Sequence, residues 1–186
     1  KSAPGVALPF GIHRGENHGE GYVVFGKAAG FGGLVRLGGL DGSDGFRLDN
    51  IRATEVSVSG AGDINGDGFD DLIVGSRAAG SDEDGPAGES YVVFGKASGF
   101  NRIIRIETLD GTDGFRLDGV DANDSSGNSV SGAGDVNGDG FHDLIIGARD
   151  ADPNGVNGAG ESYVVFGFDT GTVTHQGTAI RDTLIG

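Results

Sequence analysis

Two nine-residue segments carry oxygen-bearing side chains at a spacing that suits metal binding. They cover residues 63–71 and 135–143, and each has Asp, Asn, Asp and Asp at its first, third, fifth and ninth positions. Hard oxygen ligands, with no cysteine and no histidine at those positions, are what Ca²⁺ prefers. Two glycines in each segment let the backbone turn tightly around a centre. The pattern predicts two calcium loops; the alternative is a pair of Asn-Gly-Asp-Gly hairpin turns that bind nothing.

The residues around these segments favour β-strands. The ligand spacing is similar to the first half of an EF-hand loop, but position 12, where an EF-hand has glutamate, is Val74 in one copy and Ile146 in the other. Ser-Val-Ser-Gly precedes the first segment and Leu-Ile-Val-Gly follows its last aspartate. We therefore expect each loop to connect two strands and not two helices.

The two segments belong to a longer internal repeat. The string Tyr-Val-Val-Phe-Gly starts at Tyr22, again 69 residues later at Tyr91, and 72 residues after that at Tyr163. Asp-Gly-Ser-Asp-Gly-Phe-Arg-Leu-Asp starts at Asp41, and the same string with Thr for Ser starts at Asp110. A fixed period indicates stacked or radially arranged units, each unable to bury its apolar face alone.

Each period contains four short β-rich runs separated by Gly, Asp and Asn. A further apolar run, residues 103–106, either extends a strand or lines a loop. No segment has a sustained apolar spacing of 3.6 residues, so almost no helix is expected. The sequence predicts an all-β fold of β-propeller blades, each with four antiparallel strands. In the complete middle unit the predicted strands are residues 56–61, 71–75, 90–94 and 115–117.

The order of these motifs resembles the FG-GAP repeat of integrin α-subunit propellers, and it resembles bacterial proteins with that repeat more closely. Ser-Gly-Ala-Gly-Asp, the calcium loop, Asp-Leu-Ile-Val-Gly and Tyr-Val-Val-Phe-Gly carry the resemblance. It implies that the loop joins the first two strands of a blade and holds a structural Ca²⁺. It also implies a ligand set for two Ca²⁺ sites. In the first site the side-chain ligands are Asp63, Asn65, Asp67 and Asp71, with the backbone carbonyl of Phe69. In the second site they are Asp135, Asn137, Asp139 and Asp143, with the backbone carbonyl of Phe141.

The repeats divide the chain into about two and a half blades. We expect propeller repeats over residues 1–170, with a partial blade at 1–50, a full blade at 51–118 and a further blade at 119–170. Residues 171–186 are expected to be a C-terminal strand or tail that resembles the start of the repeats in RTX-type secreted proteins; the alternative is a final strand followed by a disordered tail. Closed propellers typically need four to eight blades. Either this is a fragment of a longer chain, or several copies form a homo-oligomer that completes a propeller.

Composition fits an extracellular calcium protein. The net charge is −15, with 28 acidic residues against 13 Lys and Arg. This negative charge disfavours nucleic acid as a partner and also disfavours membrane insertion. There is no cysteine, so calcium would replace disulfides as the stabilising cross-link. No signal peptide or membrane span is visible, and we interpret the sequence as a mature or excised piece of a secreted bacterial protein.

Other recurrent residues have structural interpretations. A Tyr and a Phe three apart on a strand face opposite sides, so core packing is favoured over a sugar-stacking platform. The Asp pairs 41/44 and 110/113 fit ordinary Asp-Gly turns better than a cation site. Glu89 and Glu161 recur one period apart, so each is expected to serve its own blade. The aromatic residues are Tyr22, Phe25, Tyr91, Phe94, Tyr163 and Phe166.

Histidines and long loops complete the candidates. His142 stands at a position not used for ligation and is expected to point to solvent, while His13 and His18 could meet a ligand. The loops at residues 76–88 and 148–160 are the first candidates for a partner surface. These features favour a non-enzymatic adhesion or recognition module for an extracellular protein or glycan. A structural assembly unit is the alternative, and a polysaccharide-acting enzyme is disfavoured because no unrepeated acid–base cluster is evident.

Overall fold

The described part of the chain is built from β-strands. The computed structural model describes residues 19–52, 55–80 and 85–170, and within them the helical segments are three single 3-10 turns, which confirms the expectation of almost no helix. None of them is long and apolar enough to cross a membrane. The predicted features at His13, His18 and residues 171–186 lie outside the described residues. The 3-10 turns are η1 (Leu37–Gly39), η2 (Ile106–Thr108) and η3 (Pro153–Gly155).

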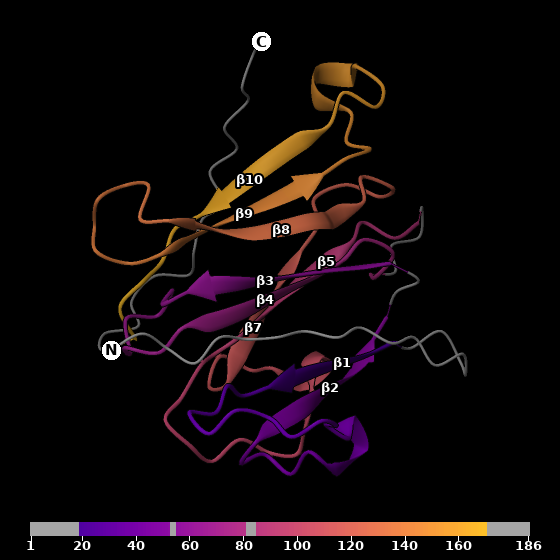
Figure 1. Ribbon diagram of the computed structural model, residues 1–186. Helices are drawn as coiled ribbons and strands as arrows, with labels where there is room; N and C mark the ends of the chain where they lie inside the picture. Colours follow the sequence, from indigo (N-terminus) through magenta and orange to yellow (C-terminus); the bar gives the residue numbers. More distant parts are fainter. Residues whose placement is uncertain (1–18, 53–54, 81–84, 171–186) are drawn as a thin grey trace.

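Among the described residues, ten strands form three sheets stacked one on another (Figure 1). The first sheet contains β1 (Gly19–Val24), β2 (Gly45–Ile51) and β6 (Ile103–Arg105). The second sheet has the order β3 (Val56–Gly62), β4 (Asp71–Ser76), β5 (Glu89–Val93) and β7 (Gly114–Asp118). The third sheet contains β8 (Ser126–Gly134), β9 (Asp143–Ala148) and β10 (Glu161–Val165).

The second sheet confirms the four strands predicted for the complete repeat. All its pairs are antiparallel, and Val74 lies opposite Val58 on one side and Tyr91 on the other. The third sheet repeats the first three of these strands in the same antiparallel order. Sheets of this kind, stacked through their first strands, are the blades of a β-propeller.

One strand departs from the purely antiparallel expectation. The run at 103–106, which could have extended a strand or lined a loop, leaves the second sheet and pairs with β2 of the first sheet in parallel. Ile104 lies opposite Leu48 in this register, and Ile106 begins η2 and is buried. The segment between the third and fourth strands of one sheet therefore binds the outer edge of the preceding sheet.

Alternating side chains fill a separate core on each face of the second sheet. Leu72 and Val74 of β4 pack toward the first sheet, whereas Ile73 between them packs toward the third sheet. Successive side chains of a strand point to opposite faces, so a continuous apolar run is expected where both faces are covered. Tyr91 and Phe94 likewise lie in different cores, which confirms the prediction that they face opposite sides.

Candidate metal-binding loops

The two predicted metal-binding segments occupy equivalent places in two sheets. Loop 1 (residues 63–70) connects β3 to β4, and loop 2 (residues 135–142) connects β8 to β9. The prediction that each loop joins the first and second strands of its sheet is confirmed. The ninth position of each segment, Asp71 or Asp143, is the first residue of the second strand.

Glycine conformation shapes both loops. Gly66 and Gly68 have φ of 71° and 88°, and their counterparts Gly138 and Gly140 have φ of 76° and 95°. L-residues with a Cβ rarely adopt this left-handed region, so the loop depends on glycine at both positions. The resulting backbone curls around the side chain of the first aspartate.

Within loop 1, the first three predicted ligands face the loop's own amides. The carboxylate of Asp63 accepts hydrogen bonds from the N–H of Asp67 at 3.0 Å and of Gly68 at 2.9 Å. The side-chain oxygen of Asn65 accepts from the N–H of Asp67 at 3.0 Å, and its amide donates to the Asp67 carboxylate at 3.0 Å. The N–H of Phe69 donates to that carboxylate at 2.9 Å. These oxygens therefore line the interior of one turn.

Loop 2 repeats these hydrogen bonds and adds one from the N–H of Gly138 to Asp135 at 2.7 Å. Asp135 accepts from the N–H groups of Asp139 at 3.1 Å and Gly140 at 3.0 Å. Asn137 accepts from the N–H of Asp139 at 3.0 Å and donates to its carboxylate at 2.7 Å. Phe141 donates its N–H to Asp139 at 2.9 Å. Two copies of the sequence pattern thus give one loop conformation.

The last predicted ligand of each loop is a buried anchor. Asp71 accepts one hydrogen bond from the N–H of Ile64 at 2.9 Å and another from the N–H of Gly95 at 2.7 Å. Asp143 accepts equivalent bonds from Val136 at 2.7 Å and from Gly167 at 2.9 Å. Each carboxylate therefore ties the loop to the segment that follows the third strand.

Negative charge gathers around the first loop. Burial raises the pKa of Asp71 to about 7, and the nearby carboxylates of Asp67 and Asp63 raise it further, whereas the N–H groups of Gly95 and Ile64 lower it. Within the described residues, none of these three carboxylates forms an ion pair. A bound cation would relieve this charge.

The structure brings the predicted ligand set only partly together. Asp63, Asn65 and Asp67 share one turn, while both oxygens of Asp71 lie against backbone amides. Among the described residues, no three acidic, histidine or cysteine groups converge closely enough to hold a metal ion by themselves. The donor chemistry, all oxygen from carboxylates and an amide beside possible backbone carbonyls, fits a hard divalent cation such as Ca²⁺. Phe69 and Phe141 could contribute only their carbonyls, since the phenyl ring offers no ligand.

The expectation for His142 is wrong in an informative way. The residue is exposed, but its ring does not simply point to solvent: Nδ1 accepts a hydrogen bond from the N–H of Asp63 at 2.9 Å. The backbone N–H of His142 donates to the carbonyl of Asp63 at 3.1 Å. A comparison of loop 2 with loop 1 cannot reveal this contact, because the partner lies in another sheet. The room for the ring comes from Gly62, where a Cβ would lie 2.5 Å from Cγ of His142.

The other acidic candidates serve local structure. Asp41 accepts from the N–H and the hydroxyl of Ser43, and these bonds lower its pKa. The N–H of Thr112 lowers the pKa of Asp110 in the same way. These are turns in which an aspartate side chain holds the backbone two residues on, as the sequence favoured. The second aspartates of the two pairs contact lysines, Asp44 with Lys27 and Asp113 with Lys96.

The recurrent glutamates pair with tyrosines of their own sheets. The hydroxyl of Tyr163 donates to Glu161 at 2.7 Å, and that of Tyr91 donates to Glu89. Glu20 receives the same bond at 2.5 Å from the tyrosine two residues on. The prediction that each glutamate serves its own blade is therefore confirmed for these pairs.

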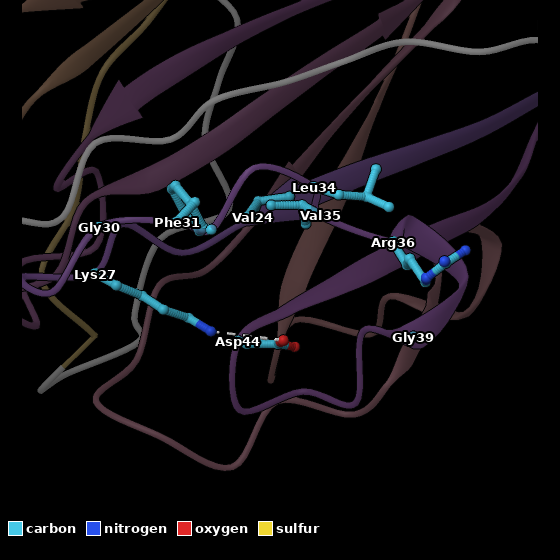
Figure 2. A pocket seen from close by; sticks show the side chains of 10 residues that line it. Val24, Lys27, Gly30, Phe31, Leu34, Val35, Arg36, Gly39 and Asp44 are labelled. Carbon is cyan, nitrogen blue, oxygen red and sulfur yellow. Dashed lines mark ion pairs between the residues drawn. The ribbon is translucent and has the colours of Figure 1, made fainter.

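Cavities also lie outside the loop interiors in the described part of the chain. One of about 320 Å³ beside β1 is lined by Phe31, Leu34 and Val35, and its ion pair joins Lys27 to Asp44 at 3.7 Å (Figure 2). A second, of about 900 Å³, lies near the base of loop 1. Its lining includes Phe25, Phe69, Asp70, Lys96, Phe100 and His142.

Comparisons with known proteins agree with this geometry. Residues 56–93 and 126–165 match the FG-GAP repeat, and each match runs from the first to the third strand of a sheet. These two segments are FG-GAP repeats, folded as adjacent blades.

Integrin α-subunits are among the chain's relatives. It is 31% identical to integrin alpha-V of Gallus gallus over 112 residues, which is 57% of this chain and 10% of the integrin. It is 35% identical to integrin alpha pat-2 of Caenorhabditis elegans over 92 residues, 50% of this chain and 7% of that protein. The chain thus spans a tenth or less of the length of the curated relatives it matches.

Proposed function

We propose that loops 1 and 2 bind Ca²⁺, and that the ions stabilise a non-enzymatic propeller module for adhesion or recognition outside the cell. The observation that carries this proposal is the duplicated loop: the same four oxygen side chains, the same hydrogen bonds and the same place between first and second strands. The unpaired charge around Asp71 supports it. The FG-GAP repeats and the integrin relatives point to an adhesion or recognition propeller.

The chain's own residues define what the ion would do. When bound, it would supply positive charge to a turn with three aspartates. Asp63, Asn65 and Asp67 would hold it from within the loop, and Asp71 would connect it to the second strand. Because the unfolded chain has no formed site, the free energy of binding adds to the free energy of folding.

Partner recognition is best assigned to the opposite end of the blades. In an antiparallel sheet, the connection from first to second strand and the connection from second to third strand lie at opposite ends. Loop 2 and the loop at residues 148–160 accordingly project to different sides (Figure 1). We therefore propose that calcium is structural, and that residues 148–160 and 76–88 contact an extracellular protein or glycan without the ion.

Calorimetric titration of the protein with Ca²⁺ tests the metal assignment. The expected result is saturable binding of two ions and a rise in melting temperature that EDTA reverses. Asp67→Asn should weaken one site about tenfold, because ligand charge sets the affinity of such loops. Asp70→Asn is the matched control: it removes the same charge at a position that the ligand set does not use. Equal effects of the two variants, or no saturable binding at millimolar calcium, would refute the assignment.

A second candidate function, assembly with a further blade, is favoured by an open face of the third sheet. Val136, Ile145 and Phe166 are 56%, 39% and 41% exposed. Their counterparts in the second sheet, Ile64, Ile73 and Phe94, are buried against the third sheet. The proposed occupant is another blade of this type, from the same polypeptide or another copy. Light scattering in calcium and in EDTA tests for a second copy, which predicts a discrete multiple of 18.8 kDa in calcium.

A further inference from the structure

Loop 1 is held by the sheet that follows it. His142 of loop 2 makes two hydrogen bonds to the backbone of Asp63. The imidazole Nδ1 of His142 accepts from the N–H of Asp63 at 2.9 Å, and the backbone N–H of His142 donates to the carbonyl of Asp63 at 3.1 Å. The ring of Phe141 covers the turn of loop 1, since a Cβ on Gly66 would lie 2.5 Å from its Cε1. Residues 141 and 142 of loop 2 therefore form a clasp on loop 1.

The chain after β10 also holds loop 1, in addition to the clasp. The N–H of Phe168 donates to the carbonyl of Ile64 at 2.8 Å, and the N–H of Thr170 donates to the carbonyl of Asn65 at 3.2 Å. The Thr170 hydroxyl also donates to the carbonyl of Asn65 at 3.2 Å. The first three residues of loop 1 thus each have a backbone group fixed by the third sheet or the segment after it.

Loop 2 has no such cover within the described residues. A Cβ at Gly134 or Gly138 would meet nothing within 4 Å, whereas a Cβ at the equivalent Gly62 or Gly66 would meet loop 2. Asn65 is 2% exposed, whereas its counterpart Asn137 is exposed. Two loops of the same conformation therefore have different surroundings: the first is held on its outer side and the second is open.

We propose that the two calcium sites fill with positive cooperativity, and that the Phe141–His142 segment of loop 2 couples them. This inference rests on the proposed function. His142 is then a positioning residue for the site in loop 1, which it contacts through the backbone of Asp63. It is not a ligand.

A single peptide group makes this coupling direct. The carbonyl of Phe141 is the proposed backbone ligand of loop 2, and the N–H of His142 in the same planar unit donates to the carbonyl of Asp63. A cation that polarises the carbonyl strengthens the N–H as a donor. An ion in loop 2 also fixes Asp139 and Asp143, the residues on either side of the clasp. Linkage is reciprocal, so an ion in loop 1 favours an ion in loop 2 by the same factor.

Calcium titration calorimetry of three proteins measures the coupling. Asp135→Ala removes the side-chain oxygens of the first ligand of loop 2, at a residue that does not belong to the clasp, and so reports the affinity of loop 1 alone. Asp63→Ala keeps the backbone of Asp63 and reports loop 2 alone. The overall association constant for two ions in the unmodified protein, divided by the product of these two constants, gives the coupling factor. We expect a factor of about five or more, within the usual range for allosteric coupling. A factor of one overturns the proposal.

Variants of His142 test its role while keeping every proposed ligand. His142→Ala removes the acceptor for the Asp63 N–H and leaves the backbone N–H of residue 142 to hold Asp63 without the imidazole, so it should lower the coupling factor to about two or less. His142→Asn places an amide oxygen where Nδ1 stood and should restore it. Asp70→Ala is the matched control, since Asp70 holds the same position in loop 1; it should leave the factor unchanged.

The outcomes separate this inference from the proposed function. If the unmodified protein shows no saturable calcium binding, the metal assignment fails and the coupling fails with it. If two ions bind with a factor of one, or if His142→Ala and His142→Asn behave alike, the calcium assignment stands and the clasp is only a packing contact.

Discussion

Replacing Gly75 by alanine should separate the second and third sheets. Gly75 lies in β4, where the backbone does not require glycine, so an alanine could adopt its conformation. Space is the constraint. A Cβ there would overlap the carbonyl oxygen of Gly127 and would lie 2.7 Å from Cγ1 of Val130, both in β8. The obstacle is backbone, which cannot rotate away, so the two strands must move apart.

The same repeat supplies a matched control. Gly147 holds the equivalent position in β9, and a Cβ there would meet only the Ser129 hydroxyl closely, at 2.5 Å, with the next atoms at 3.8 Å. That hydroxyl can rotate. Alanine in place of glycine also lowers the entropy of the unfolded chain, which stabilises the fold by about 0.4–1 kcal/mol where the site is compatible. Gly147→Ala should therefore stay within about 0.5 kcal/mol of the unmodified protein.

The size of the effect at Gly75 follows from the cost of overpacking. Such insertions cost about 1–3 kcal/mol, and the backbone obstacle at Gly127 favours the upper end. After the gain from unfolded-state entropy, a net loss of about 2 kcal/mol remains. For a chain of this size that corresponds to a fall in melting temperature of about 4–8 °C.

Thermal unfolding followed by circular dichroism tests the pair. Both variants are melted in excess calcium and again in EDTA, so that a change in ion affinity is separated from a change in packing. The difference between Gly75→Ala and Gly147→Ala should persist in both buffers. Equal melting temperatures for the two variants would show that the close approach of β4 and β8 does not constrain the fold.

Two further pairs of variants test the cores by the same melting assay. Phe46→Ala should cost about 3–5 kcal/mol, because the ring is 3% exposed, whereas Phe31→Ala should change stability by less than about 0.5 kcal/mol at a ring that is 48% exposed; similar losses would contradict the assigned core. Tyr91→Phe should cost about 1–3 kcal/mol, since it leaves the buried carboxylate of Glu89 without its hydroxyl donor. Tyr22→Phe should cost less, because water can replace the hydroxyl beside the half-buried carboxylate of Glu20. An equal cost for the two variants would contradict the assumption that burial of the glutamate sets the penalty.

Strands whose partners are near in sequence were predictable. The runs that became β3, β4 and β5 are short apolar segments bounded by glycine and aspartate, and each pairs with its neighbour along the chain. The two-residue period of a strand also assigned Tyr91 and Phe94 to opposite cores. The parallel pairing of β6 with β2 was not predictable from local pattern, because it depends on the free outer edge of a different sheet.

The candidate site was likewise predictable where its contacts are local in sequence and not where they join distant residues. Spacing alone placed the oxygen side chains of loop 1 inside one turn, since aspartate, asparagine and glycine determine their local hydrogen bonds. The contact of His142 with loop 1 could not be predicted from the sequence, because its bond to Asp63 joins residues 79 apart in the chain. The one sequence signal was Gly62, whose lack of a side chain leaves room for the imidazole, but many glycines of this chain serve turns and do not mark a contact.

Near-identical repeats are therefore not equivalent once stacked. The array has a direction: loop 1 is clasped by residues of the following sheet, whereas loop 2 has no such cover within the described residues, so the surroundings of a loop depend on what comes after it. Ile64 is fully buried and its counterpart Val136 is 56% exposed, although the two loops share their ligand pattern and their hydrogen bonds. If the proposed calcium sites exist, the affinity of each loop in such an array should depend on the loop together with its successor. A further blade packed on the third sheet should raise the affinity of loop 2 toward that of loop 1, and the ions would then stabilise the contacts between blades as well as the turns within them.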